Sequence, residues 1–463
     1  MARDYKTPGV YVEEITKFPP SVAQVETAIP AFIGYTELVE HPTAGVLTNK
    51  PRRITSMLEY ERFFGSAKHE EGIKVEVKPN ASTGASDIVV SVATPSKYKM
   101  YYSLQFYFAN GGGPCYVVSV GDYSTDTIDF NELSTGLKAS DKVDEITLIL
   151  FPDAQDMNVD NFYNIQKAAL DSCVKLQDRF VIMDVHHADD IDPDQNKSID
   201  ALRDKLSGST DILKYGAAYY PNVETILDYV FDDDDVVVKV EGSDKKLGDL
   251  KATSNALYFQ VKAAILDKPL IMTPSAGIAG IYADVDSNRG VWKAPANVNM
   301  NYVIKPTIII SDDEQKGLNV DVNGGKSINV VRSFTGRGSA IVWGARTLAG
   351  NDNEWRYVSV RRFCNMVEES VKKAAGQFVF EPNDANTWVR VRAMIENFLI
   401  LQWRAGALQG AKPDHAFYVA VGLNQTMSAI DVLEGRMIVE IGMAVVRPAE
   451  FIILRFSQMM PQS

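Results

Sequence analysis

Two aspartates, Asp153 and Asp184, directly follow apolar segments that are typical of buried strands. Active-site residues gather at the carboxyl ends of strands in α/β sheets, and two carboxylates can act as acid and base in glycoside hydrolysis. The sequence fixes no distance between these aspartates, and no nucleophile motif accompanies them. A hydrolase-like α/β enzyme with its site near Asp153 and Asp184 is therefore an alternative hypothesis for this chain.

Three further patterns have the residue types of ligand sites but not the spacing. His186 and His187 are adjacent, and neighbouring residues on a strand point to opposite faces, which makes them a poor metal pair. The run 232–235 is four aspartates without the spacing and turn glycine of an EF-hand loop. The stretch 324–327 reads Gly-Gly-Lys-Ser, but Val320 stands where a phosphate-binding loop needs glycine, so a turn is expected. The sequence predicts no catalytic residue, metal or cofactor.

The three cysteines, Cys115, Cys173 and Cys364, lie far apart and lack metal-ligand or redox spacing. We expect each to be a small buried hydrophobic residue. The first residues are charged and no apolar signal-peptide core follows them, which predicts that the chain is made in the cytosol and either stays there or leaves by a route other than a signal peptide. No apolar run approaches the ~18 residues that a membrane span needs, so direct membrane insertion is not expected.

The chain of 463 residues exceeds one ordinary core and is acidic, with 47 Lys and Arg against 60 Asp and Glu and a net charge of −13. This balance argues against general binding to nucleic acid or anionic membranes. The charge is uneven: residues 321–463 hold 16 basic and 13 acidic side chains, which leaves 31 and 47 for the rest. We therefore expect the C-terminal third to face different surroundings.

Strands and helices alternate through the first half of the chain, where Asp153 and Asp184 lie. The predicted strands are 115–120, 146–151, 180–185 and 215–220, and the predicted helices are 162–176 and 199–206. This alternation predicts an α/β layer with a partly parallel sheet.

Two helices are predicted in the last third. In the first, apolar residues recur at helical spacing from Val360 to Phe378, and Arg361, Arg362, Lys372 and Lys373 lie off that stripe. The second runs from about Trp388 to Gln402, with Asp384 or Asn386 as its cap and Gly406 at its end. Any functional face of the first helix should be its basic side.

Both ends of the chain carry strand-like segments. Residues 437–445 alternate in polarity, residues 451–456 are apolar on both faces, and residues 10–15 form a short strand after a Thr-Pro-Gly turn. An unpaired apolar strand is an aggregation hazard unless it completes a sheet. The pattern leaves two possibilities open: the terminal strands pair within their own domain, or they are lent to neighbouring molecules.

Short motifs in order along nearly the whole chain carry a family resemblance; they are Thr7–Glu14, Phe108–Gly113 with Cys115–Val118, Phe151–Ala154, Tyr219–Pro221, Pro274–Ala283, Arg289–Asn297, Gly336–Gly338, Val342–Thr347, Trp355–Arg362, Val379–Asn383 and Pro448–Phe451. With these motifs the chain resembles contractile tail sheath proteins. That family forms the outer sleeve of myophage tails, R-type bacteriocins and phage-tail-like injection systems. Residues 68–97 and 231–250 match least.

The resemblance implies a structural subunit without cofactors, not an enzyme. In the family, six subunits form a ring, rings stack helically around an inner tube, and terminal arms add strands to the sheets of neighbours. Contraction is a rigid-body change from a metastable extended state to a more stable one. The implied partners are the inner tube protein, baseplate and terminator proteins, and paralogous sheath subunits. The implied location is the bacterial cytoplasm during assembly and then a phage tail or related particle.

The resemblance also implies a domain plan and roles for residues. Residues 1–30 and 291–463 would form an inner core domain with exchanged terminal strands, and residues 31–290 an outer α/β domain with insertions at about 68–97 and 231–250. The candidates for strand exchange between subunits are Val10, Tyr11, Val12, Phe451, Ile452, Ile453, Leu454 and Phe456. The candidates for facing the tube are Arg361, Arg362, Lys372 and Lys373.

Overall fold

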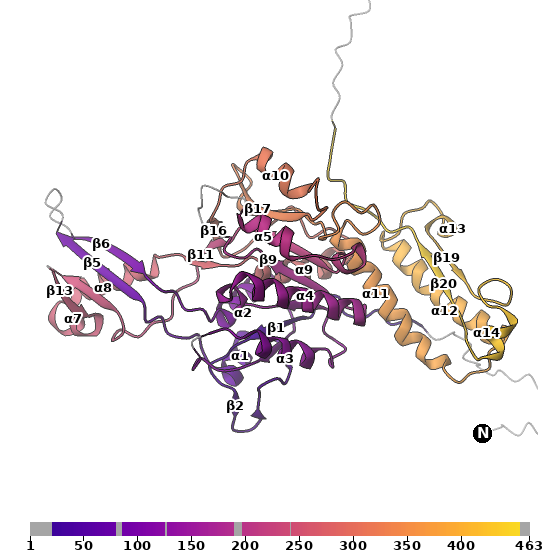
Figure 1. Cartoon of the computed structure of the whole chain (residues 1–463), viewed down its shortest axis with the longest axis horizontal. Helices are drawn as coiled ribbons and strands as arrows, with labels where there is room; N and C mark the ends of the chain where they lie inside the picture. The colour runs from indigo at the N-terminus through magenta and orange to yellow at the C-terminus, as the bar shows by residue number, and fades with distance from the viewer. Residues whose placement is uncertain (1–20, 80–85, 126, 189–196, 241, 454–463) are drawn as a thin grey trace, which may run out of the picture. The chain divides into compact units, whose positions relative to one another are not determined.

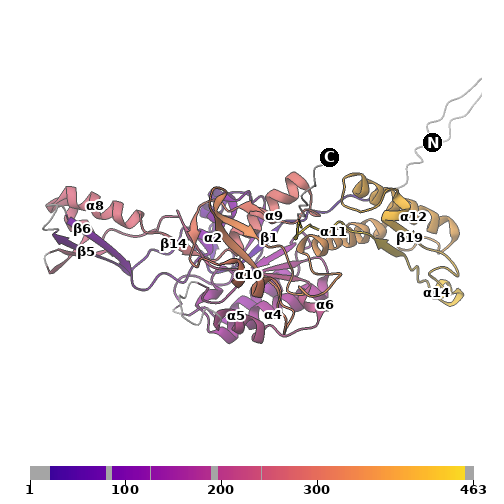
Figure 2. The same ribbon diagram turned by 90° about the horizontal axis from the view of Figure 1, so that it is seen from above.

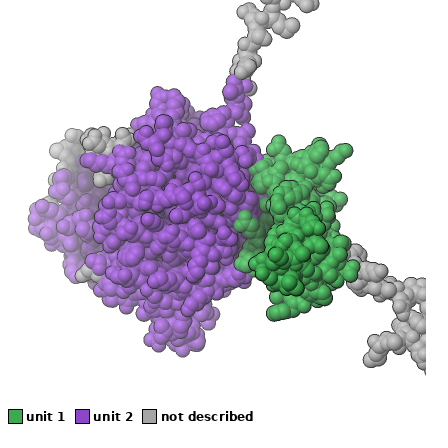
Figure 3. All heavy atoms as spheres, turned by 45° about the vertical axis from the view of Figure 1, so that its right-hand side comes forward, with its two compact units in different colours: residues 1–25, 367–446 green, residues 26–366, 447–463 purple. Residues whose placement is uncertain are grey.

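The computed structural model describes residues 21–79, 86–125, 127–188, 197–240 and 242–453. The chain divides into two compact units (Figure 3). Unit 1 comprises residues 1–25 and 367–446, and unit 2 comprises residues 26–366 and 447–463. The domain boundaries at about residues 30 and 290 that the resemblance implies stay a prediction.

Unit 2 is built on a nine-stranded mixed sheet (Figure 1). From one edge to the other its strands are β15 (Val298–Asn299), β18 (Gly338–Trp343), β17 (Ile328–Phe334), β10 (Gly216–Tyr220), β9 (Phe180–Asp184), β8 (Leu148–Leu150), β1 (Pro30–Gly34), β7 (Cys115–Ser119) and β4 (Arg52–Ile54). The six strands from β17 to β7 run parallel, and antiparallel strands flank them on both sides. The predicted strands of the first half all lie in this sheet.

Each face of this sheet has its own apolar core. Along β1, Ala31 and Ile33 enter one core and Phe32 the other, because successive side chains of a strand alternate in direction. The first core contains residues of α3 (Phe130–Ser140), α4 (Val159–Leu176), α5 (Lys197–Lys205), α6 (Thr210–Leu213) and α10 (Asp312–Asn319). The second contains residues of α1 (Met57–Phe64), α2 (Met100–Ala109) and α9 (Ser275–Arg289). Helices on both faces of a mostly parallel sheet confirm the predicted α/β class.

The two stretches that match the family least form one module. Its sheet has the order β13 (Ser243–Lys246), β12 (Val237–Val240), β5 (Ile73–Pro79), β6 (Ser86–Val92), and α7 (Leu247–Thr253) and α8 (Asn255–Leu266) complete it. Strands β5 and β12 pair in parallel, with Val75 opposite Val238 and both side chains buried. Figures 1 and 2 show the module at one end of unit 2. What the sequence presents as two insertions is one folded element.

Two further small sheets complete the described strands of unit 2. Strands β14 (Leu270–Met272), β11 (Val223–Thr225) and β16 (Val303–Pro306) form an antiparallel sheet in unit 2, and β2 (Glu40–His41) pairs with β3 (Gly45–Val46). The described residues also contain the 3-10 turns η1 (Ala154–Asp156) and η2 (Gly376–Phe378). No helix within the described ranges is long and apolar enough to span a membrane.

Unit 1 contains the end of α11 (Val358–Ala375), then α12 (Ala385–Arg404), α13 (Pro413–Ala416), β19 (Phe417–Ala420), α14 (Ala429–Leu433) and β20 (Glu440–Met443). The side chain of Asp384, one of the two predicted caps, caps α12 by accepting from the backbone N–H of Thr387. The predicted stripe of α12 is buried from Val391 to Gln402. The predicted strand 437–445 is shorter than expected, since only Glu440–Met443 pairs regularly with β19.

Candidate functional site

Asp153 is a buried structural carboxylate that is only 1% exposed. Its Oδ2 accepts from the backbone N–H of Tyr35 at 2.7 Å, and its Oδ1 accepts from those of Lys99 at 2.5 Å and Met100 at 3.1 Å. Gly34 leaves room for it, because a Cβ there would lie 2.2 Å from Oδ2. The pKa of Asp153 is raised to about 7, because the effect of burial exceeds the opposite effect of the three backbone hydrogen bonds. The carboxylate thus joins β1 to the start of α2.

Asp184 has the same kind of role at the start of α9. Its Oδ1 accepts from the backbone N–H of Ser275 at 2.9 Å and its Oδ2 from the Ser275 hydroxyl at 2.6 Å. The pKa of Asp184 is raised to about 6, because the effect of burial exceeds the opposite effect of the hydrogen bonds from Ser275 and Thr273. Both aspartates of the enzyme hypothesis are thus engaged in holding backbone and side-chain donors in place.

The other patterns with ligand chemistry also have structural roles. His186 is buried, and its Nε2 lies 2.9 Å from the carbonyl oxygen of Met157. The predicted turn at 324–327 is present: the Asp321 carboxylate accepts from the backbone N–H groups of Asn323, Gly324 and Lys326. Within the part of the chain that the structure describes, no three His, Cys, Asp or Glu side chains are arranged to hold a metal ion. All three cysteines are buried thiols, as predicted.

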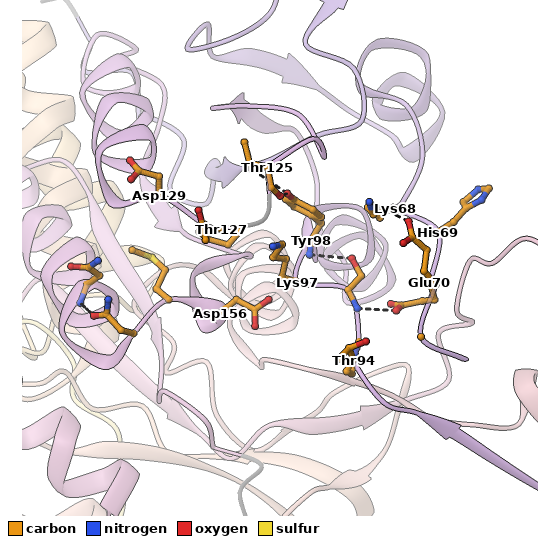
Figure 4. Close-up of a pocket in the computed structure, with 18 residues that line it drawn as sticks. Lys68, His69, Glu70, Thr94, Lys97, Tyr98, Thr125, Thr127, Asp129 and Asp156 are labelled. Atoms are coloured by element: carbon orange, nitrogen blue, oxygen red, sulfur yellow. Dashed lines mark hydrogen bonds and ion pairs between the residues drawn. The ribbon is translucent and has the colours of Figure 1, made fainter. Parts of the chain in front are cut away.

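A polar pocket of about 920 Å³ lies in unit 2 beside η1 and the N-terminal side of α2 (Figure 4). Its lining includes Lys97, Asp129, Asp156 and Glu70, and none of the aspartates and histidines considered above. Glu70 is 1% exposed; one carboxylate oxygen accepts from the N–H of Ser96 at 2.8 Å. Burial raises the pKa of both Glu70 and Asp156, whereas the charge of nearby Lys99 lowers each. The pocket mixes charges of both signs, which selects no ligand class.

Phe451, Ile452 and Ile453 are 72%, 79% and 77% exposed and belong to no strand of the structure. Apolar side chains so exposed at consecutive positions are unusual in a subunit that functions alone. The remaining strand-exchange candidates, Val10, Tyr11, Val12, Leu454 and Phe456, lie outside the described residues.

The structure buries Arg361 and Arg362, which are 2% and 3% exposed, rather than placing them on a basic surface. The guanidinium of Arg361 lies over the ring of Trp355 and donates to Asn365. These two arginines are therefore corrected from surface candidates to buried groups of unit 2. A helical position off the apolar stripe stays exposed only if no other element covers it, and the rest of unit 2 covers this part of α11.

Lys372 and Lys373 lie at the other end of α11 with side chains 68% and 41% exposed. Both ammonium groups are paired with Glu369, at 3.0 and 3.5 Å. Their contact with a tube stays a prediction.

The family model described as the phage tail sheath C-terminal domain matches residues 350–458. Among solved structures, the helical sheath of the anti-feeding prophage in its contracted state is 32% identical, with a TM-score of 0.64 over 98% of this chain and 99% of that one. A chain of the anti-feeding prophage baseplate gives 32% identity and 0.64 over 98% and 100%. The contracted sheath complex of the extracellular contractile injection system PVC gives 29% and 0.65 over 99% of each chain. The chain belongs to the contractile tail sheath family. A search of curated proteins gives no match.

Sequence reasoning missed two residues of this sheath protein that stand in motifs it had recognised. Arg346, in the motif Val342–Thr347, holds the carboxylate of Glu450, in the motif Pro448–Phe451, with Nε–Oε1 and Nη2–Oε2 distances of 2.9 and 2.5 Å. The pair lies 104 positions apart in sequence. Each of the two motifs contains a charged residue, basic in one and acidic in the other, which could have drawn attention to them. Nothing in the sequence indicates that these two residues pair with each other.

Proposed function

We propose that this chain is the structural subunit of a contractile sheath, in which hexameric rings stack helically around an inner tube. The observation that carries the proposal is the likeness over the whole chain to sheath subunits, with nearly complete coverage on both sides. On this likeness the chain acts mechanically rather than as an enzyme. The stroke releases energy stored during assembly, when the extended state forms.

Subunits are linked by strand exchange at both chain ends. Phe451–Ile453 are apolar and exposed, and a strand that completes a neighbour's sheet would bury them. The receiving sheet is the ribbon of β19 and β20, neither of which pairs with a third strand among the described residues. A two-stranded sheet is marginally stable alone, so added strands from neighbours would stabilise it. The segment around Val10, Tyr11 and Val12 supplies the second added strand.

The remaining partners follow from this role. Lys372 and Lys373 face an acidic surface of the tube protein, and the ends of the stack contact baseplate and terminator proteins. Paralogous sheath subunits share the particle where the genome encodes them. The subunit assembles in the bacterial cytoplasm and then forms part of a phage-tail-like particle.

Coexpression of the chain with the tube and baseplate proteins encoded beside it tests the proposal. Negative-stain electron microscopy should show striated cylinders, extended when intact and shorter and wider after triggering. A small monodisperse particle under all these conditions, with hydrolytic activity on sugars, would overturn the proposal in favour of the enzyme hypothesis.

A further inference from the structure

The chain passes between its two compact units three times, at residues 25/26, 366/367 and 446/447. Two buried arginine–carboxylate clusters in unit 2 lie within four residues of these passages. One holds Thr27 and includes Arg362, and the other holds Glu450. Each of the three connections between the units therefore has, among its nearest residues in unit 2, one that belongs to one of these clusters.

The C-terminal clamp consists of Arg346, Tyr357 and Glu450. Besides its two-pronged contact with Glu450, the guanidinium of Arg346 donates from Nη1 to the carbonyl oxygen of Asn319 at 3.1 Å. The Tyr357 hydroxyl donates to Glu450 Oε2 at 3.3 Å. Arg346 is itself fixed, since Asn329 on β17 accepts from its backbone N–H and donates to its carbonyl oxygen. Phe451, the first residue of the exposed apolar segment 451–453, directly follows Glu450.

The N-terminal clamp consists of Thr27, Asp286 and Arg362. Arg362 donates from Nη1 and Nη2 to the two carboxylate oxygens of Asp286 at 3.0 and 2.5 Å. Its Nη2 also donates to the Thr27 carbonyl oxygen at 2.9 Å, and the Thr27 hydroxyl donates to Asp286 Oδ2 at 2.6 Å. The guanidinium lies 4.5 Å from the ring centroid of Tyr282. One arginine on α11 thus joins the N-terminal connection, α9 and α11.

Burial separates the two clamps from the ion pairs on the surface. The side chains of Arg362 and Asp286 are 3% and 6% exposed, and those of Arg346 and Glu450 are 3% and 18% exposed. Desolvation offsets much of the attraction in such pairs, so stability alone does not account for them. What a two-pronged arginine–carboxylate contact adds is a single fixed orientation of the group that it holds.

We infer that the two clamps are positioning devices. The C-terminal clamp fixes where residues 451–453 leave unit 2, so that the strand which they begin reaches a second copy of this chain in one register. The N-terminal clamp fixes residues 26–29 where the chain passes into unit 1. This inference rests on the proposed sheath function. Free rotation of residues 447–453 would spread the C-terminal arm over many directions and lower its effective concentration at the receiving sheet. Free rotation of residues 26–29 would leave unfixed the point from which residues 1–25 enter unit 1. The clamps therefore set the geometry of the linkage without contacting the neighbouring subunit.

The test uses the full chain with Glu450→Gln, Arg346→Lys or Asp286→Asn. Asp160→Asn is the matched control: it breaks the 2.7 Å Lys205–Asp160 pair, whose carboxylate is 63% exposed. A nitroxide on Ile453→Cys, or on exposed Glu26→Cys, reports mobility beside each clamp, because the native thiols are buried. Arg346→Lys keeps the charge and loses the fork, so it should not rescue the geometry.

We expect each clamp variant to mobilise its own nitroxide while circular dichroism stays that of the wild type. In unlabelled particles, the yield of regular cylinders should fall about tenfold or more, the ratio that a loss of 1.4 kcal/mol produces. The control should leave both readouts unchanged. Tyr357→Phe removes one hydroxyl contact and serves where a charge variant does not fold; it should give the same changes in milder form.

Two results would overturn the inference. One is an unchanged nitroxide spectrum in the folded clamp variants, and the other is mobile nitroxides with cylinders of normal yield and spacing. Failure of the wild-type chain to form cylinders would contradict the sheath function instead, and the nitroxide spectra of isolated subunits would still report the clamps.

Discussion

Asp153 follows a strand at a position where active-site residues gather in α/β folds, but its carboxylate accepts hydrogen bonds from three backbone N–H groups. Asparagine has an NH₂ group in place of one carboxylate oxygen, so the backbone N–H of either Tyr35 or Lys99 would lose its acceptor. We expect Asp153→Asn to destabilise the subunit by about 1–3 kcal/mol, the cost of a buried donor without a partner. Urea unfolding measures this loss, with the 82% exposed Asp211→Asn as the control. A hydrolytic activity that disappears at unchanged stability would contradict the structural role.

Asp184 makes a pH-dependent contribution to stability. Because burial raises its pKa to about 6, the unfolded chain ionises first as the pH rises from about 4. The folded state then binds more protons than the unfolded state, so stability falls with rising pH until about 6 and is level above that value. The difference amounts to about 3 kcal/mol over this window.

Asp184→Asn should lack this decline. Denaturant unfolding of both proteins at several values between pH 4 and pH 7.5 measures it as the difference between the two curves. Parallel curves for the wild type and Asp184→Asn would show that Asp184 is ionised throughout the folded range.

The proposed C-terminal strand can be tested by a single proline substitution. Proline at Ile453 removes an amide donor and breaks a strand ladder. Because Ile453 is 77% exposed and lies in no strand of its own chain, Ile453→Pro should leave folding and thermal melting within about 0.5 kcal/mol of the wild type. Sheath assembly should be lost, which electron microscopy of coexpressed particles measures. An unfolded or aggregated Ile453→Pro subunit would instead place this strand within its own core.

The module of β5, β6, β12, β13, α7 and α8 gives a second prediction for elements. Its two chain segments share one apolar interior, in which Val75 and Val238 face the same side of adjacent strands. Replacing residues 72–93 alone by a short linker would expose the apolar side of β12 and α8 and should make the subunit aggregate. Replacing residues 72–93 and 232–267 together should restore a soluble subunit, as measured by size-exclusion chromatography. Equal solubility of the single and double deletions would contradict a shared core.

For the assembled particle, we expect that binding of the sheath to the proposed tube depends on surface charge. Lys372→Glu with Lys373→Glu should weaken contact with an acidic tube by about 1 kcal/mol per subunit, and more at low salt, where screening is weak. The matched control is Lys245→Glu with Lys246→Glu on exposed β13. The measurement is the fraction of tubes that are sheathed at low and at high salt. Equal sheathing by both pairs of variants at low salt would exclude this face of α11 from the tube contact.

Several elements of the fold were predictable from local sequence patterns. Period and capping predicted α12 with its buried stripe and with Asp384 as one of two possible caps, and alternation predicted four of the nine strands of the large sheet. These features depend on residues within a few positions of one another, so they can be read locally. Ordered motifs likewise carried the family, because they recur in sequence whatever their contacts are.

Which charged side chains are buried, and which residues they hold, depends on contacts between distant segments of the chain. Arg362 was predicted to be on the surface, but it is buried with Asp286, which lies 76 positions away, and it holds Thr27 from the far end of the chain. The pairing of β5 with β12 and of Arg346 with Glu450 likewise joins distant segments. The physical reason is that helical period says which side of a helix is polar, whereas burial depends on what the rest of the chain places against that side. A buried guanidinium is stable only with a partner, and the fold alone supplies it.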